Sequence, residues 1–175
     1  MIAQIAAFKT RLYASIGEVV LAMLNLPRYR NQSLADVLHL VVERLICDCI
    51  AIARTVGEGK IKETAGTAIW VSVSDEVDAK IREQVKARAF PTRLKAEDWA
   101  SGDTHWLLDV IASSQKVGTA VLANFKEFVK DKPIRIHPIV GQLVDPAVLE
   151  RMKVRTADTT ESSGEDASLH AVGHR

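Results

Sequence analysis

The sequence is poor in cysteine, and its two thiols cannot build a disulfide framework. Cys47 and Cys49 are the only cysteines among 175 residues, so a small cross-linked scaffold is excluded. They stand two apart in an apolar run that alternates like a strand, and we expect both to be buried, reduced thiols. No metal site is predicted, because the histidines are scattered along the chain: His39, His105, His137, His170 and His174.

An excess of one charge and long apolar runs are also missing. With 23 basic and 22 acidic residues, the formal net charge is +1, so no global field attracts nucleic acid or an anionic membrane. The chain has no run of about 18 apolar residues, and its N-terminus lacks the pattern of a secretory signal. We therefore expect a cytoplasmic protein with no integral membrane segment and no nucleic-acid partner.

Apolar residues are plentiful and make up 47% of the sequence, which is enough for one globular domain with its own core. From Thr156 onward the composition turns to small, polar and charged residues, with almost no bulky apolar side chain. Such a segment cannot bury enough surface to offset its ordering entropy. The sequence thus predicts a domain over residues 1–155 and a disordered tail over residues 156–175.

Hydrophobic periodicity and capping residues predict helices mixed with strands. Apolar spacing, the N-caps Ser33 and Ser74, and Pro146 at a first helical position predict these helices: 5–24, 34–46, 75–87, 119–129 and one from 146. Apolar runs bounded by turn residues predict these strands: 50–53, 68–73, 106–111 and 134–140. Such mixing around one sheet indicates an α+β or α/β fold.

The segment Glu97–Ala112 combines an acidic, turn-rich start with an apolar strand that carries one charge, Asp109. An ionised group in a buried strand is expensive unless it is paired or used in chemistry. Asp109 therefore either pairs with a cation, such as Arg135 on the next predicted strand, or serves a function. After the strand, Gln115-Lys-Val-Gly-Thr-Ala120 leads into a helix, and Gly118 would let a ligand approach the backbone closely.

This segment resembles the toxin-activating lysine acyltransferases, which fatty-acylate internal lysines of pore-forming repeat-in-toxin proteins. The family carries Glu-Asp-Trp-x-Ser-Gly-Asp-x-x-Trp-x-x-Asp-x-Ile-Ala, and Glu97 to Ala112 match it closely. The resemblance implies a single acetyltransferase-like (GNAT-like) α+β domain, with a mixed central sheet flanked by helices, that forms a homodimer. It also implies that the donor is the acyl-phosphopantetheine of acyl carrier protein, with no permanently bound cofactor, and that the substrate is a protein with acceptor lysines.

The resemblance also assigns roles to individual residues. Asp109 falls on the family's catalytic aspartate, and the backbone after it would hold the thioester arm: Ser114, Gln115, Lys116, Gly118 and Thr119. The family's catalytic histidine falls on Tyr29, whose phenol, with a pKa of about 10, is a weak base at neutral pH.

His39 is the nearest substitute for that histidine, with Asp36 and Glu43 on the same helical face. Alternatively, His39 has no catalytic role and lies on a solvated polar face of the helix. Either Tyr29 or His39 completes the catalytic pair with Asp109, or the chain is a catalytically silent member that binds an acyl carrier or a protein partner.

Overall fold

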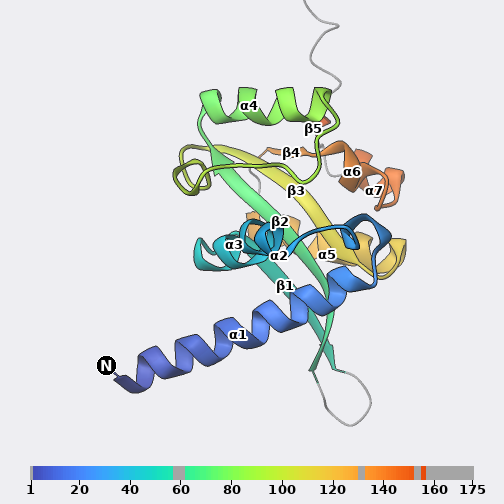
Figure 1. The fold of residues 1–175 in the computed structure, drawn as a ribbon. Coiled ribbons are helices and arrows are strands. Elements are labelled where there is room, and N and C mark those ends of the chain that lie inside the picture. Colours follow the sequence, from blue (N-terminus) through green and yellow to red (C-terminus); the bar gives the residue numbers. More distant parts are fainter. Residues whose placement is uncertain (1, 57–61, 130–132, 152–154, 157–175) are drawn as a thin grey trace, which may run out of the picture.

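The computed structural model describes residues 2–56, 62–129, 133–151 and 155–156. Figure 1 shows the helices: α1 (Ile2–Leu24), α2 (Leu34–Val37), α3 (Glu43–Ile46), α4 (Asp75–Lys86), α5 (Gln115–Val129), α6 (Pro138–Gly141) and α7 (Pro146–Arg151). Single 3-10 turns lie at Pro27–Tyr29 and Ala96–Asp98, and a π-helical segment, Leu38–Val42, joins α2 to α3.

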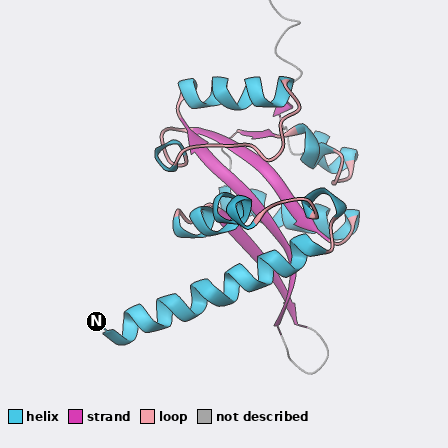
Figure 2. Cartoon of the chain, viewed as in Figure 1, coloured by secondary structure: helices cyan, strands magenta, loops and turns pink. Residues whose placement is uncertain are grey.

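A mixed sheet of five strands forms the centre of the molecule (Figure 2). In spatial order the strands are β1 (Ile50–Val56), β2 (Lys62–Val73), β3 (Thr104–Ala112), β4 (Ile134–Ile136) and β5 (Arg155–Thr156). The β1–β2 and β2–β3 pairs are antiparallel, whereas the β3–β4 and β4–β5 pairs are parallel. The predicted α+β class, with a mixed sheet flanked by helices, is therefore confirmed.

Helices pack on both faces of the sheet, and each face has its own apolar core. The first core lies under α1, the α2–α3 segment and α4, and its large buried side chains include Leu40, Ile69, Ile81, Trp99 and Trp106. The second core lies under α5 and includes Leu107, Val110, Leu122, Phe125 and Ile136. Because β3 lies between the two cores, it is buried from His105 to Ile111. Any polar group on it must find its partners inside the protein.

The N-terminal half of α1 projects away from the sheet (Figure 1). Residues 2–11 are all exposed, whereas Val19 and Met23 are buried in the first core. The next helical segment begins as predicted at Ser33, whose hydroxyl accepts from the Asp36 N–H while the Asp36 carboxylate accepts from the Ser33 N–H. This reciprocal cap fixes the start of the segment that lies over β2 and β3.

Several predicted boundaries are wrong. The strand predicted over 50–53 extends to Val56, and the strand predicted over 68–73 begins at Lys62. The strand predicted over 134–140 ends at Ile136, because Pro138 has no N–H to give to a sheet and instead takes the first position of α6. The helix predicted over 119–129 begins earlier, at Gln115. The Ser114 hydroxyl accepts from the Val117 N–H at 3.3 Å, so Ser114 acts as the cap of α5.

The prediction that both thiols lie buried in one strand is also wrong. Cys47 is exposed at the end of α3, and only Cys49 is buried. Asp48 between them has a φ of 56°, which turns the chain from the helix into β1. The thiols therefore differ in environment, and burial raises the pKa of Cys49 to about 11.

The C-terminal boundary moves by one residue, because Thr156 pairs with Ile136 at the edge of the sheet. The rest of the predicted tail, residues 157–175, lies outside the described residues. Of the helices that the structure describes, none combines the length and the apolar character needed to cross a membrane.

Candidate active site

Asp109 faces the first core because β3 contains a bulge. A regular strand alternates its faces at every residue, so Trp106 and Ile111, an odd number of positions apart, should lie on opposite faces. Both nevertheless belong to the first core. The register with β2 passes from Asp109 directly to Leu107 and leaves Leu108 without a partner. This extra residue reverses the alternation and directs the carboxylate toward the helices on the α1 side.

Asp109 is 3% exposed, and its carboxylate is held by three donors. Arg28 Nη2 donates to Oδ1 at 3.0 Å and to the Val110 carbonyl at 2.8 Å. The Val110 N–H also donates to Oδ1, at 2.7 Å, and the Tyr29 hydroxyl donates to Oδ2. The 3-10 turn Pro27–Tyr29 thus supplies both side chains that contact this carboxylate.

Arg135 does not pair with Asp109, so that alternative prediction is wrong. Arg135 Nη1 donates to both carboxylate oxygens of Asp78 on α4, at 2.6 and 2.7 Å. Trp106 Nε1 donates to the same carboxylate at 2.7 Å. This network connects α4 to β3 and β4. The cation that pairs with Asp109 is therefore Arg28 rather than Arg135.

Burial changes the acid strength of Asp109. It raises the pKa of the carboxyl to about 6 from its ordinary 3.8, while Arg28 and the Val110 N–H oppose the rise. At neutral pH the group is ionised, yet it is a stronger base than an exposed aspartate. Tyr29 is 4% exposed, and its ring centroid lies 5.5 Å from that of Phe90 and 4.7 Å from the Arg28 guanidinium. These contacts fix the ring that carries the hydroxyl.

A small cavity adjoins the carboxylate and is lined by Leu40, Arg44, Phe90 and Asp109, among others. Arg44 is 2% exposed, and it donates from Nε to the His39 carbonyl at 3.1 Å and from Nη2 to the Thr92 carbonyl at 3.3 Å. Burial lowers the pKa of Arg44 to about 10, so it stays charged at neutral pH. The guanidinium of Arg44 therefore lines the cavity beside Asp109, in addition to Arg28, which binds the carboxylate.

His39 is not brought to this site. Its side chain is exposed, and its Nδ1 lies 2.9 Å from a carboxylate oxygen of Glu43. Asp36, the other predicted neighbour, instead pairs with Arg93 at 2.9 Å. Of the two alternatives for the partner of Asp109, the structure brings Tyr29 into contact with it and leaves His39 outside that contact.

The predicted arm-binding residues lie at the start of α5. Ser114, Gln115 and Lys116 are exposed, and the first turn of a helix leaves its N–H groups without partners in the helix. Gly118 does not offer an open backbone, because a Cβ there would lie 2.9 Å from the Leu143 carbonyl oxygen. Its N–H is also taken by the Ser114 carbonyl at 2.9 Å. Thr119 accepts through Oγ1 from the Asp145 N–H at 3.2 Å. Only the first part of the segment remains open to a ligand.

The sequence matches a known enzyme family over most of its length. Residues 9–146 match the model of the RTX toxin acyltransferase family. The chain belongs to this family. A search of curated proteins found no match. The matched region contains both members of the buried pair, Tyr29 and Asp109.

Sequence reasoning missed the two arginines of this site. Arg28 directly precedes Tyr29, and Arg44 follows Glu43 in the otherwise apolar run from Leu40 to Ile46. A single charge in an apolar run is the signal that indicates Asp109, whereas the neighbouring Glu43 hides that signal at Arg44. The partner of Arg28 could not be read from the sequence, because 81 positions separate it from Asp109.

Proposed function

We propose that this chain is a GNAT-like acyltransferase that moves a fatty acyl group from acyl carrier protein to internal lysines of a toxin-type protein. The observation that carries the proposal is the buried contact of Tyr29 with Asp109, within a chain that belongs to the acyltransferase family. The bulge in β3 and the helix that starts just after it support a site at this strand.

In the proposed reaction, a neutral lysine amine attacks the thioester carbonyl. The C–N bond forms, the C–S bond breaks, and one proton passes from nitrogen to the departing sulfur. A lysine has an ordinary pKa of about 10.4, so a nearby group must also accept the proton of its ammonium form.

In the proposed reaction, Tyr29 contacts the amine and Asp109 acts on it through Tyr29. Every described contact of Asp109 is a donor from the protein, so the carboxylate acts through Tyr29 rather than on the substrate directly. The Tyr29 hydroxyl donates a hydrogen bond to Asp109, so its oxygen can take the proton of the ammonium while its own proton moves to the carboxylate. Arg28 holds the carboxylate ionised and in place.

The start of α5 is the proposed place of the phosphopantetheine arm. The exposed first turn at Gln115 and Lys116 presents N–H groups toward solvent, and a helix N-terminus favours a phosphate. The closed packing of Gly118 restricts this role to the first turn.

A homodimer is part of the proposal. The projecting half of α1 exposes Ile5 and Phe8, which are 51% and 54% accessible. A second copy of the chain would cover apolar side chains that the body of the protein leaves in water.

The experiment offers the purified chain acyl carrier proteins loaded with short to long acyl chains, together with pooled peptides that each contain one lysine. Mass spectrometry then follows loss of the thioester and gain of an acyl group on lysine. Transfer that disappears in Asp109→Asn is the expected result. Intact thioester with every donor, at every chain length, would overturn the proposed enzyme.

A silent binding module is the second candidate function. It is favoured by the complete burial of the pair, since Tyr29 and Asp109 are both closed off by Arg28 and Phe90. Tight binding of an acyl-loaded carrier protein without transfer, measured by calorimetry in the same samples, would select this function.

A further inference from the structure

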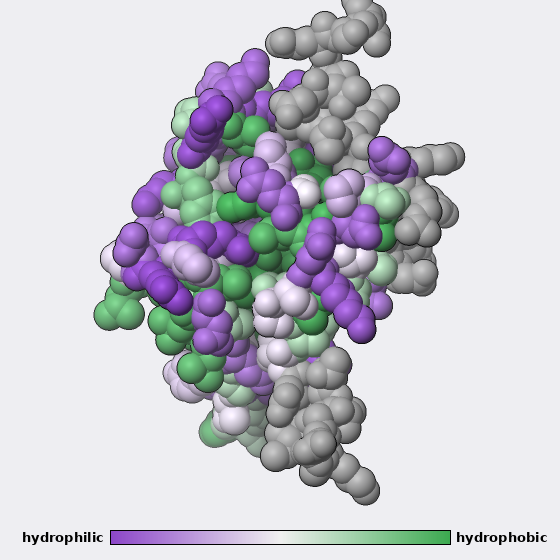
Figure 3. All heavy atoms as spheres, turned by 90° about the vertical axis from the view of Figure 1, so that its right-hand side faces the viewer, coloured by the Kyte–Doolittle hydropathy of each residue, from purple (hydrophilic) through white to green (hydrophobic). Residues whose placement is uncertain are grey.

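A cavity of about 700 Å³ lies between the end of α4 and the start of α6. Its apolar walls come from Val85, Phe90 and Ile139, and the exposed cations Lys86 and Arg88 stand at its rim. Figure 3 views the side of the molecule that bears α6 and α7, where apolar surface shows between charged side chains. Phe90 also lines the small cavity beside Asp109, so the two spaces share this side chain.

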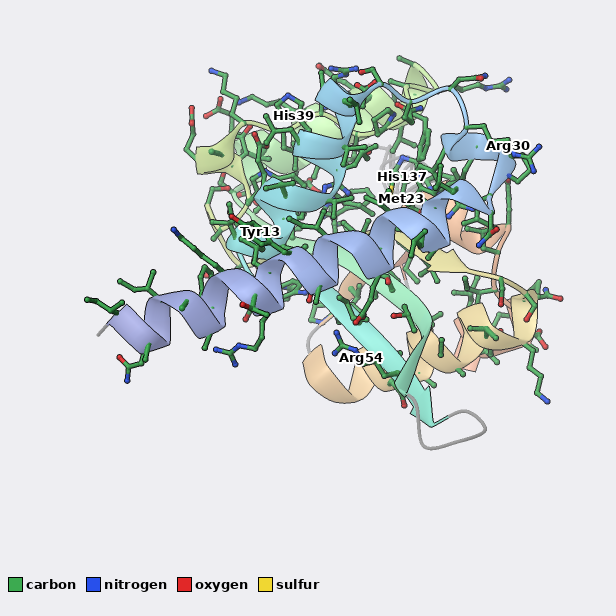
Figure 4. All side chains as sticks on the ribbon, turned by 60° about the horizontal axis from the view of Figure 1, so that its bottom comes forward. Tyr13, Met23, Arg30, His39, Arg54 and His137 are labelled. Atoms are coloured by element: carbon green, nitrogen blue, oxygen red, sulfur yellow. The ribbon has the colours of Figure 1, made fainter. Side chains whose placement is uncertain are left out.

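His137 lines the large cavity from the end of β4. Ile134 and Ile136 belong to the core under α5, whereas Arg135 reaches Asp78 on the opposite side of the sheet. By the same alternation, His137 faces the side to which the bulge directs Asp109. Its backbone N–H donates to the Leu107 carbonyl at 2.9 Å, two residues before that aspartate. Figure 4 labels both His137 and the exposed His39, which come from different elements.

The hydrogen bonds of His137 fix which nitrogen carries the proton. Its ring is 7% exposed, and Nδ1 accepts from the Ile139 N–H at 3.2 Å. Burial lowers the pKa of His137 below its ordinary 6.5, so the ring is neutral at pH 7. A neutral imidazole whose Nδ1 accepts must carry its proton on Nε2. Within the described residues, this buried Nε2 has no hydrogen-bond partner.

We infer that the Nε2–H of His137 is the donor that holds the carbonyl oxygen of the acyl thioester in this cavity. The inference rests on the proposed acyltransferase function and names a group that acts on its donor. A buried N–H without an acceptor is costly, and a carbonyl oxygen from a ligand supplies the missing acceptor. The apolar walls suit the acyl chain that follows the carbonyl, and the cations at the rim favour negative charge on the bound oxygen.

The role of this donor follows from the bond changes of the reaction. When the amine nitrogen bonds to the carbonyl carbon, the electron pair of the C=O double bond moves to oxygen and makes an oxyanion. The Nε2–H stabilises this charge without transferring its proton. When the pair returns, the C–S bond breaks and the sulfur receives the proton that leaves nitrogen. A donor already in position needs no reorganisation at that step.

Two substitutions separate this role from a structural one. His137→Asn places an amide oxygen near the Nδ1 position, which keeps the acceptor for the Ile139 N–H, but it removes the donor at the Nε2 position. His137→Gln places an amide N–H₂ near the Nε2 position but loses the acceptor for the Ile139 N–H. We expect His137→Asn to melt close to wild type and to transfer acyl groups about 10²-fold more slowly. We expect His137→Gln to melt lower and to be the faster of the two variants.

The assay uses the full chain, acyl-loaded carrier protein and the pooled lysine peptides, with kcat and the KM for the donor measured separately. A fall in kcat for His137→Asn at nearly unchanged KM supports the oxyanion role. Full activity of His137→Asn, beside an active wild type, overturns this inference and leaves the acyltransferase in place. An inactive wild type overturns both. Independently of activity, ¹⁵N NMR of the ring at neutral pH should show the proton on Nε2, and a proton on Nδ1 would contradict the assignment.

Discussion

At the scale of single residues, the site depends on how an ionisable group behaves inside a strand that has no access to water. Asp109 keeps its charge through Arg28, the Val110 N–H and the Tyr29 hydroxyl. Burial still outweighs these contacts and raises the pKa of the carboxyl to about 6. The native state therefore holds a proton on Asp109 more tightly than the unfolded chain does.

The first prediction concerns the pH dependence of stability. The folded pKa of Asp109 lies above the unfolded one, so its stabilising contribution is full below about pH 3.8 and is lost as pH rises through about 6. Asp109→Asn removes this dependence. Urea unfolding from about pH 4 to about pH 7 should show wild type losing up to roughly 3 kcal/mol relative to the variant. Asp103→Asn, at an exposed aspartate, is the control, and a pH-independent difference for Asp109→Asn would contradict the shift.

The second prediction assigns the partner of Asp109 in the reaction. Tyr29→Phe keeps the ring against Phe90 and removes only the hydroxyl. Acyl transfer should fall on the order of 10²-fold, as expected for loss of a group that handles a proton. The free energy of unfolding should fall by about 1–2 kcal/mol for one buried hydrogen bond.

His39→Ala is the comparison for that variant, because the exposed His39 makes its described contact with Glu43. We expect its transfer rate to stay close to that of wild type. The reverse pattern, with activity lost in His39→Ala and kept in Tyr29→Phe, would show that His39, not Tyr29, is the partner of Asp109 in the reaction. Initial rates at saturating donor are the measurement.

At the scale of elements, long periodic segments could be predicted, and local departures from regular geometry could not. Helix α1, the Ser33 cap and the strand around Asp109 follow from apolar spacing and capping chemistry. The bulge at Leu108 could not be predicted, because it exists only in the pairing of β3 with β2. Without it, an alternating pattern would place Asp109 on the α5 side.

The same distinction explains the shifted boundaries at β4 and α5. Pro138 carries a sequence signal against a strand, but apolar residues on both sides of it obscured that signal. The sequence predicts Gly118 as a loop residue open to a ligand, whereas it lies within α5 and packs against Leu143. A glycine that serves close packing and one that serves a ligand look alike in a sequence.

The third prediction tests that packing with a matched pair of glycines. In Gly118→Ala the new methyl group would lie 2.9 Å from the Leu143 carbonyl oxygen, so either the backbone at Leu143 or helix α5 must shift. We expect a loss of about 1–3 kcal/mol in the free energy of unfolding. Gly17→Ala on α1, where nothing lies within 4 Å of the added group, should instead stabilise the protein by about 0.5–1 kcal/mol. Equal effects of the two variants in urea unfolding would contradict the close contact.

At the scale of the whole molecule, the main question is what covers the projecting half of α1. Residues 2–11 are exposed on every side, so a monomer gives this part of the helix no tertiary support. Helices of this length are marginal in water without a packed apolar face. Ile5 and Phe8 lie three positions apart on one face and provide such a face for a second copy.

The last prediction is therefore that the chain is a dimer joined through α1. Phe8→Glu places a charge on the apolar face and should shift sedimentation equilibrium toward the monomer, by about tenfold or more in the dissociation constant, because burying an unpaired charge costs more than about 1.4 kcal/mol. Thr10→Glu adds the same charge on roughly the opposite face of the helix, since successive residues advance by about 100°, and should leave the dimer intact. Far-UV circular dichroism of Phe8→Glu should also lose helical signal on dilution, because the N-terminal half of α1 loses its support. A wild-type chain that sediments as a monomer at all concentrations would contradict the α1 interface.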